Sequence, residues 1–244
     1  MPHRPIIPVW KNERMITMTV AEAMQARHSV RSYKDTPLGA EVISAMQKEI
    51  DACNKESGLH IQMAVDEPKA FDSFMAHYGK FSGVRNYIAL IGKKGSDLDE
   101  KLGYYGERLV LLAQRLGLNT CWVAMTFGKN AAKSRCTIAS GEKLVCVLSL
   151  GYGATQGTAH KSKSMDALCH TEGAMPEWFR KGMEAAMLAP TAMNQQKFLI
   201  SLLGNNVTAK SLGGFYSKVD LGIIKYHFEM GAGKENFQWS IAIQ

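Results

Sequence analysis

Residues 27–31, near the N-terminus, bring together side chains that could hold a phosphate group. Arg27 and Arg31 carry guanidiniums, His28 an imidazole and Ser29 a hydroxyl. Guanidiniums suit phosphate because their forked donors match its oxygens and stay charged at any working pH. The alternative interpretation is a solvated helix end with scattered arginines, and it stays open for this stretch taken alone.

Two further polar segments lie far downstream in the chain. Residues 189–196 read Ala-Pro-Thr-Ala-Met-Asn-Gln-Gln. In the polar stretch 154–164, Lys161 and Lys163 lie beside His160. Because lysines in loops usually face solvent, phosphate binding by this pair is the less common of two interpretations.

Length and composition limit the possible classes of protein. The chain of 244 residues can bury a core and suits one large domain or two small ones. No apolar run approaches the roughly 20 residues of a membrane-spanning helix. Residues 1–18, with three prolines and scattered charges, lack the apolar core of a signal peptide. We therefore expect an extended N-terminal arm over 1–18, no membrane partner and a cytoplasmic location.

Charge and cysteine content argue against other classes. The formal net charge is +7, but the basic residues are dispersed and not interleaved with aromatic ones, so we expect no nucleic-acid partner. A modestly basic surface instead favours phosphate-bearing cofactors. The five cysteines are widely spaced and form no Cys-x-x-Cys pair. This spacing argues against a disulfide framework and against a zinc or other metal site.

Capping signals and apolar spacing predict the elements that position these segments. Thr19 and Glu22 fit a capping box that starts a helix ending near Arg27. Apolar residues at spacings of three and four predict the clearest helix, over 102–116, closed by Gly117. The remaining expected helices cover 41–53, 176–189 and 219–230, and the expected strands cover 60–65, 86–91, 119–124, 143–150 and 198–203.

A predicted helical face over 71–78 and a histidine on the last helix have structural interpretations. A face formed by Phe71, Phe74, Met75 and Tyr78 is interpreted as core or lid. His227 is interpreted as a residue of an amphipathic face. Beyond residue 166, a helix, a proline-containing turn, a strand and a second helix repeat the plan of the first part in shortened form. Strands mixed with helices throughout predict an α+β or α/β sandwich.

Four motifs together resemble the FMN-dependent nitroreductase family. Residues 27–33 are similar to its Arg-Arg/His-Ser-x-Arg/Lys signature, and residues 189–196 to its Ala-Pro-Ser-x-x-Asn-x-Gln-Pro-Trp signature. Residues 103–122 resemble the long central helix and the strand that passes the flavin ring. Residues 151–153 with the two lysines resemble the late phosphate-contact segment. The resemblance covers roughly 20–230 and implies an α+β fold, a nitroreductase-like α/β/α sandwich with a mainly antiparallel central sheet.

The order of the two signatures differs from that of ordinary family members. There the second signature follows the first by a few dozen residues, whereas here it lies in the later, shortened part of the chain. Family members are typically intertwined homodimers whose flavin site takes one signature from each subunit. The resemblance therefore implies a fused pseudo-dimer with a first half over 19–168 and a shortened second half over 169–244. We expect the halves to clasp one FMN per chain, in a monomer or a homodimer.

The resemblance also implies roles for individual residues. The phosphate would be neutralised by arginines and lysines, with a histidine as a contact or a structural helix-end residue: Arg27, Arg31, Lys161, Lys163 and His28. Ribityl or ring-edge oxygens would be held by Ser29, Asn194 and Gln196. One ring face would lie against Pro190, Thr191, Ala192 and Met193. The backbone near Trp122 and Val123 would donate toward the flavin N5.

The activity implied by the resemblance needs no catalytic side chain. Hydride from NAD(P)H would reach flavin N5 and then pass to a small acceptor such as a nitroaromatic or a quinone, while the protein supplies orientation and electrostatics. The alternative is an FMN-binding carrier, sensor or flavin-processing protein without nitroreductase turnover, since a fold does not dictate a reaction. Lys197-Phe198 stands where Pro-Trp is common, and Asn119 replaces a frequent glycine, so the pocket wall differs locally from the family pattern.

Overall fold

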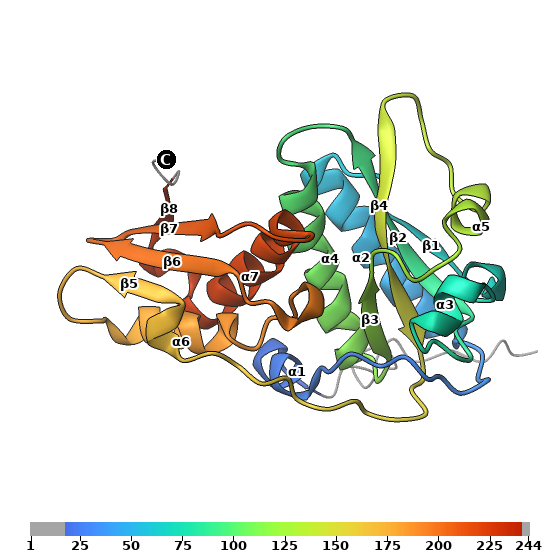
Figure 1. Ribbon diagram of the computed structural model, residues 1–244, viewed down its shortest axis with the longest axis horizontal. Helices are drawn as coiled ribbons and strands as arrows, with labels where there is room; N and C mark the ends of the chain where they lie inside the picture. Colours follow the sequence, from blue (N-terminus) through green and yellow to red (C-terminus); the bar gives the residue numbers. More distant parts are fainter. Residues whose placement is uncertain (1–17, 241–244) are drawn as a thin grey trace, which may run out of the picture.

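The computed structural model describes residues 18–240 (Figure 1). The expected N-terminal arm therefore lies, apart from Met18, outside the described residues.

The elements of the first part of the chain are α1 (Val20–Ala26), α2 (Ala40–Ser57), β1 (Gln62–Ala64), η2 (Pro68–Ala70), α3 (Phe74–Tyr78), β2 (Asn86–Lys93), α4 (Leu98–Arg115), β3 (Asn119–Val123), α5 (Lys129–Ser134) and β4 (Glu142–Gly151). Those of the later part are η3 (Met165–Ala167), β5 (Cys169–Thr171), α6 (Glu177–Ala186), η4 (Ala192–Asn194), β6 (Phe198–Leu203), β7 (Asn206–Ser211), α7 (Ser217–Ala232), η5 (Lys234–Asn236) and β8 (Gln238–Trp239).

The first sheet has the strand order β1-β2-β4-β3, and every pairing in it is antiparallel. All but the last residue of β2 is buried, which matches a strand covered on both faces. Helices α2 and α4 pack on one face. A second apolar cluster that includes Phe71, Phe81 and Tyr87 covers the other face.

The second sheet, drawn in orange in Figure 1, has the order β5-β6-β7-β8. Its central pair, β6 and β7, is antiparallel, while β5 and β8 run parallel to their neighbours. Buried residues alternate with more exposed ones along β6 and β7, as expected for a sheet with one covered face. Helices α6 and α7 pack against each other in this part of the chain, and α7 also contacts β7.

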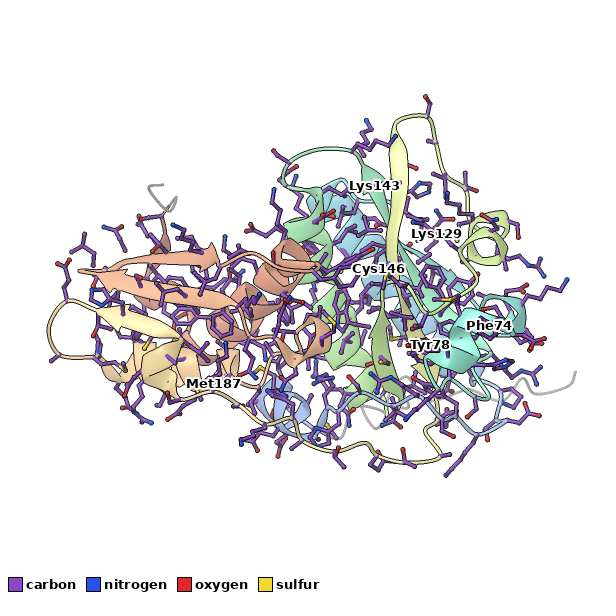
Figure 2. The ribbon with its side chains drawn as sticks, in the orientation of Figure 1. Phe74, Tyr78, Lys129, Lys143, Cys146 and Met187 are labelled. Carbon is purple, nitrogen blue, oxygen red and sulfur yellow. The ribbon has the colours of Figure 1, made fainter. Side chains whose placement is uncertain are left out.

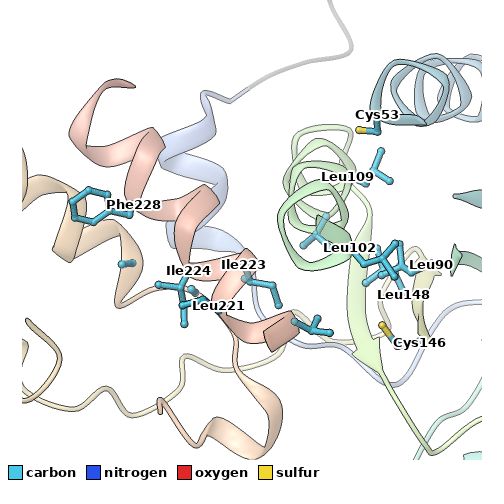
Figure 3. Packing of buried hydrophobic residues seen from close by; sticks show 14 of the residues in the cluster. Cys53, Leu90, Leu102, Leu109, Cys146, Leu148, Leu221, Ile223, Ile224 and Phe228 are labelled. Carbon is cyan, nitrogen blue, oxygen red and sulfur yellow. The ribbon is translucent and has the colours of Figure 1, made fainter. Parts of the chain in front are cut away.

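Helices α4 and α7 pack against each other between the two sheets (Figures 1 and 3). Glycines allow their backbones to come close. A Cβ at Gly222 would overlap the backbone oxygen of Glu100, and one at Gly103 would overlap the backbone oxygen of Val219. Around this contact, apolar residues of both helices and of the first sheet form one continuous core.

Most predicted elements and the fold class are confirmed. The protein is α+β with mainly antiparallel strands, arranged within the described residues as two sheets. Thr19 and Glu22 form both hydrogen bonds of the capping box that starts α1. Helix α2 extends to Ser57, four residues beyond its predicted end. Pro176 is the N-cap of α6 and not its first helical residue. Strands β5, β7 and β8 and helix α5 have no counterpart in the sequence-based prediction.

The aromatic face predicted over 71–78 is only partly core. Phe71 is buried, but α3 is a five-residue helix that leaves Phe74 82% and Tyr78 75% exposed (Figure 2). A helix of little more than one turn buries few side chains, so most of this aromatic face lies in solvent. Among residues 18–240, no helix is both long and apolar enough to cross a membrane.

The close helix crossing predicts a large effect of a single methyl group. Gly222→Ala should lower the free energy of unfolding by about 3 kcal/mol, because the backbone of α4 leaves no room for a Cβ. Urea denaturation measures this change. Gly39→Ala, at the N-cap of α2 where nothing lies within 4 Å, is the control and should cost less than about 1 kcal/mol. Similar losses in the two variants would contradict a close crossing.

Candidate functional site

A cavity of about 260 Å³ lies where the two parts of the chain meet. Its wall combines segments that are far apart in the sequence. The lining residues are Ser29, Arg31 and Phe81; Cys121 to Thr126; Cys146; Pro190 to Met193; and Phe215, Tyr216, Val219, Asp220 and Ile223. The structure thus brings eight of the predicted site residues to one cavity: Ser29, Arg31, Trp122, Val123, Pro190, Thr191, Ala192 and Met193.

The arginine segment is held in place as an extended chain beside β3. Helix α1 ends at Ala26, and the backbone of its C-cap residue, Arg27, is extended. Ser29 then forms a parallel bridge with Thr120. The backbone N–H of Val30 donates to the Thr120 oxygen at 3.0 Å. Arg31 then lies with its guanidinium carbon 5.9 Å from the centre of the Phe81 ring, within the range of a cation–π contact. These contacts fix Ser29 and Arg31 at the edge of the cavity.

The segment 190–196 forms a strained loop on the opposite wall. Met193, Asn194 and Gln196 have φ of 53°, 53° and 45°, in the left-handed region that non-glycine residues seldom adopt. Such strain persists only where surrounding contacts enforce it, and it concentrates at functional sites. One enforcing contact is internal, because the Gln196 backbone N–H donates to Thr191 Oγ1 at 3.1 Å.

The second enforcing contact comes from Asp220 of α7. Its carboxylate accepts hydrogen bonds from the Ala192 backbone N–H (2.9 Å) and from Gln195 Nε2 (2.7 Å). Burial raises the pKa of Asp220 from its ordinary 3.8 to about 6, and the two hydrogen bonds partly oppose that rise. Nothing in the sequence marks Asp220 as a site residue, since a lone aspartate near a helix start is most often a simple first-turn carboxylate.

The segment 154–164, here called the strap, connects the two parts and lies beside both signatures. Gln196 Nε2 donates to the Lys161 oxygen (2.9 Å), and Gln196 Oε1 accepts from the Lys163 backbone N–H (2.8 Å). Asn194 Nδ2 also donates to the Lys161 oxygen, and Lys163 Nζ donates to the Gln196 oxygen, both at 3.0 Å. Asn194, Gln196 and the two lysines therefore lie together outside the cavity lining, with their polar groups joining loop to strap.

The strap also contacts the arginine segment. A Cβ at Gly157, whose φ is +71°, would clash with His28 and with the Ser29 backbone oxygen, so only glycine fits this approach. Burial, followed by the charge of Arg27, lowers the pKa of His28. Arg27 is 4% exposed, and its Nε has no hydrogen-bond partner among the described residues. The predicted residues Arg27 and His28 thus lie behind the cavity wall rather than in its lining.

Comparison with known proteins identifies the family. A family model described as "Putative TM nitroreductase" matches residues 19–232. The chain belongs to this nitroreductase family. A search of curated proteins gave no match.

Solved structures show the same fold. A "putative nitroreductase" from Thermotoga maritima has a TM-score of 0.59 at 22% identity, with 88% of this chain and 83% of that chain covered. A nitroreductase-like protein from Streptococcus mutans has a TM-score of 0.51 at 13% identity, with 60% of this chain and 94% of that chain covered. At such identities the likeness establishes the nitroreductase fold alone.

The protein also has a second cavity, of about 330 Å³, beside the other central helix. In each cavity one helix contributes its N-cap residue and the third, fourth and seventh residues beyond it. In α7 these are Tyr216, Val219, Asp220 and Ile223, and in α4 they are Asp97, Glu100, Lys101 and Tyr104. Each cavity also contains a tryptophan from a strand that follows the other helix in the chain, Trp122 of β3 beside α7 and Trp239 of β8 beside α4. The two cavities therefore take their lining from corresponding positions of α4 and α7.

The raised pKa of Asp220 predicts a pH-dependent contribution to stability. Between about 3.8 and 6, the folded chain holds a proton that the unfolded chain has released, so this contribution falls as pH rises. Relative to Asp220→Asn, the wild-type protein should lose about 2 kcal/mol of unfolding free energy between pH 4.5 and 7.5. Urea denaturation of both proteins across this range measures the difference. Parallel pH profiles would contradict the buried, proton-binding carboxyl.

Proposed function

We propose that the protein is an FMN-dependent oxidoreductase that transfers hydride from NAD(P)H to a small acceptor such as a nitroaromatic or a quinone. The observation that carries this proposal is the single cavity that joins the arginine segment of the first part to the loop 190–196 of the second. Both segments match the signatures that nitroreductase-like chains use for flavin. Membership of the nitroreductase family supports the same activity class.

The residues at the cavity fit a flavin nucleotide. Arg31 and Ser29 provide a cation and a hydroxyl for phosphate or ribityl oxygens. Behind the wall, Arg27 Nε is a buried donor with no acceptor among residues 18–240. Apolar side chains such as Val123 and Ile223 line the remaining wall, as suits a flat, largely apolar ring. A cation and a hydroxyl in a largely apolar wall suit the two chemical parts of FMN.

We assign binding and positioning roles to the chain, while bound flavin supplies the hydride chemistry. The backbone at the end of β3, near Trp122 and Val123, would face the reacting edge of the ring. The loop 190–193, held by Asp220, would exclude water from one ring face. Lys161 and Lys163 would add positive charge from the strap. The expected contact of Asn194 and Gln196 with flavin oxygens stays a prediction, because their amides bind the strap.

We expect one flavin per chain, in a monomer or a homodimer. The second cavity is crossed by ion pairs, with Lys101 Nζ 2.7 Å from Asp97 Oδ2 and Lys225 paired with Glu100. Among residues 18–240, no arginine lines this cavity. A flavin there would have to displace paired charges and would find no guanidinium for its phosphate.

Visible absorbance of the purified protein tests the proposal. After FMN is added and the excess is removed, we expect about one equivalent of flavin per chain, bleached by NADH or NADPH without oxygen and restored by an acceptor. Flavin that nicotinamide fails to bleach would overturn the oxidoreductase proposal and favour an FMN carrier or sensor. Absence of retained flavin would contradict the cofactor assignment itself.

Substitution of one cavity arginine should weaken FMN binding selectively. Arg31→Ala removes a charge-assisted contact, so we expect the dissociation constant of FMN to rise 10- to 100-fold. Quenching of flavin fluorescence on binding measures the constant. The control is Arg180→Ala on α6, where Arg180 pairs with Glu177 and Glu184 of its own helix, and this variant should bind FMN as the wild type does. Equal affinity of Arg31→Ala and wild type would remove Arg31 from the site.

A further inference from the structure

A buried polar cluster lies directly behind the cavity wall, between α4 and α7. Glu107 and His227 are both fully buried, and His227 Nε2 lies 2.9 Å from Glu107 Oε1. Trp122, which lines the cavity, donates its Nε1–H to Glu107 Oε2 at 2.9 Å. Arg27 Nε lies 3.9 Å from Glu107 Oε1. His227 is thus a buried partner of Glu107, and its interpretation as an amphipathic-face residue is wrong.

Hydrogen-bond geometry determines how many protons the pair holds. His227 Nδ1 lies 3.0 Å from the backbone oxygen of Ala185 in α6. A carbonyl can only accept, so Nδ1 carries a hydrogen. The contact between Nε2 and Oε1 also needs one proton, either on the imidazole or on the carboxyl group. The pair therefore contains one proton more than a neutral imidazole beside a carboxylate.

The surroundings place that proton on the imidazole. Glu107 accepts from Trp122 and lies near the guanidinium of Arg27, and both favour the ionised carboxylate. The nearby Tyr226 contributes no charge, because burial raises the pKa of its phenol. The cluster then contains the cations of Arg27 and His227 and the single anion of Glu107.

This arrangement leaves one positive charge without a buried partner. Glu107 makes its short contacts with His227 and Trp122, while Arg27 Nε stays 3.9 Å from Glu107 and has no hydrogen bond within the described part of the chain. A buried charge is costly unless it is paired. Arg27 is two residues from Ser29, which lines the cavity, so an anionic group bound there would compensate the charge.

We propose that His227 is a positioning residue: as an imidazolium it neutralises Glu107 and so keeps the charge of Arg27 available to an anionic occupant of the cavity. The proposal rests on the proposed function in taking this occupant to be a flavin nucleotide. Without the imidazolium, the carboxylate of Glu107 would be free to pair with Arg27 and cancel its charge. His227 thereby controls the positive charge available at the cavity, although it lies on α7 and does not line the cavity.

Nitrogen NMR of the imidazole tests the protonation state without any flavin. The full chain is labelled with ¹⁵N-histidine, and the His227 signals are assigned by their loss in His227→Gln. We expect both ring nitrogens to be protonated, because each lies within hydrogen-bond distance of an oxygen that accepts. In Glu107→Gln, whose amide can donate to Nε2, that nitrogen should become unprotonated. An unprotonated Nε2 in the wild type would overturn the proposal.

Binding of FMN to matched variants tests the consequence. His227→Gln should raise the dissociation constant of FMN about tenfold, because Glu107 then cancels Arg27. Glu107→Gln should bind FMN at least as tightly as the wild type, because it removes the anion and keeps the hydrogen bonds. A merely structural role would weaken both variants alike, and that result would overturn the proposal. His170→Gln on β5 is the control.

Riboflavin, which lacks the phosphate, identifies the anionic group. An effect of His227→Gln on FMN but not on riboflavin assigns the compensating charge to the phosphate. If His227→Gln weakens the binding of reduced riboflavin and of reduced FMN equally, the compensating charge belongs to the anionic reduced ring. If His227→Gln changes the binding of neither flavin, the proposal is contradicted. If the wild type binds no flavin, the proposed function fails, whereas the NMR measurement still decides the state of His227.

Discussion

The close crossing of α4 and α7 at Gly103 and Gly222 is the constraint on which the rest of the structure depends. Each helix belongs to a different part of the chain, and each carries part of the apolar core on its buried side. With the two helices in contact, the first turns of α7 and the end of β3 contribute to one cavity, through residues such as Asp220 and Trp122. The loop 190–196 is brought to the arginine segment by the same contact. A larger separation of the helices would open gaps in the core and would also move the loop 190–196 away from the arginine segment.

The two cavities differ in the chemistry of the helix positions that line them. The same positions relative to the N-cap of α4 and of α7 line one cavity each, but their residue types differ. On α7 they include Val219 and Ile223, which keep the wall apolar, whereas on α4 they include Glu100 and Lys101, which form ion pairs. Exposed ion pairs contribute little to stability, so the charges of the second cavity are poorly explained as stabilising devices.

The sequence predicts the parts of the fold and site whose signals are local. The leucine spacing of α4 and the capping box of α1 depend on neighbouring residues, and both predictions are confirmed. The convergence of the two signatures could be expected only from the family resemblance. His227 and Asp220 were missed because burial of a single polar residue depends on partners far away in the sequence, such as Glu107 and Ala192. Short edge strands such as β5 and β8 carry too few residues to show an alternating pattern.

The buried acids behind and beside the cavity act in the same way: each accepts hydrogen bonds that hold neighbouring groups in place. Asp220 is a buried acid that holds a strained loop through two hydrogen bonds, and Glu107 is a buried acid that holds Trp122 and His227. Neither lies in a part of the core where an apolar residue could replace it without orphaning a donor. Buried charges of this kind are weak devices for stability. Their placement on α7 and α4, on either side of the helix crossing, instead lets the packing of two helices determine the shape and charge of a cavity that neither helix could form alone.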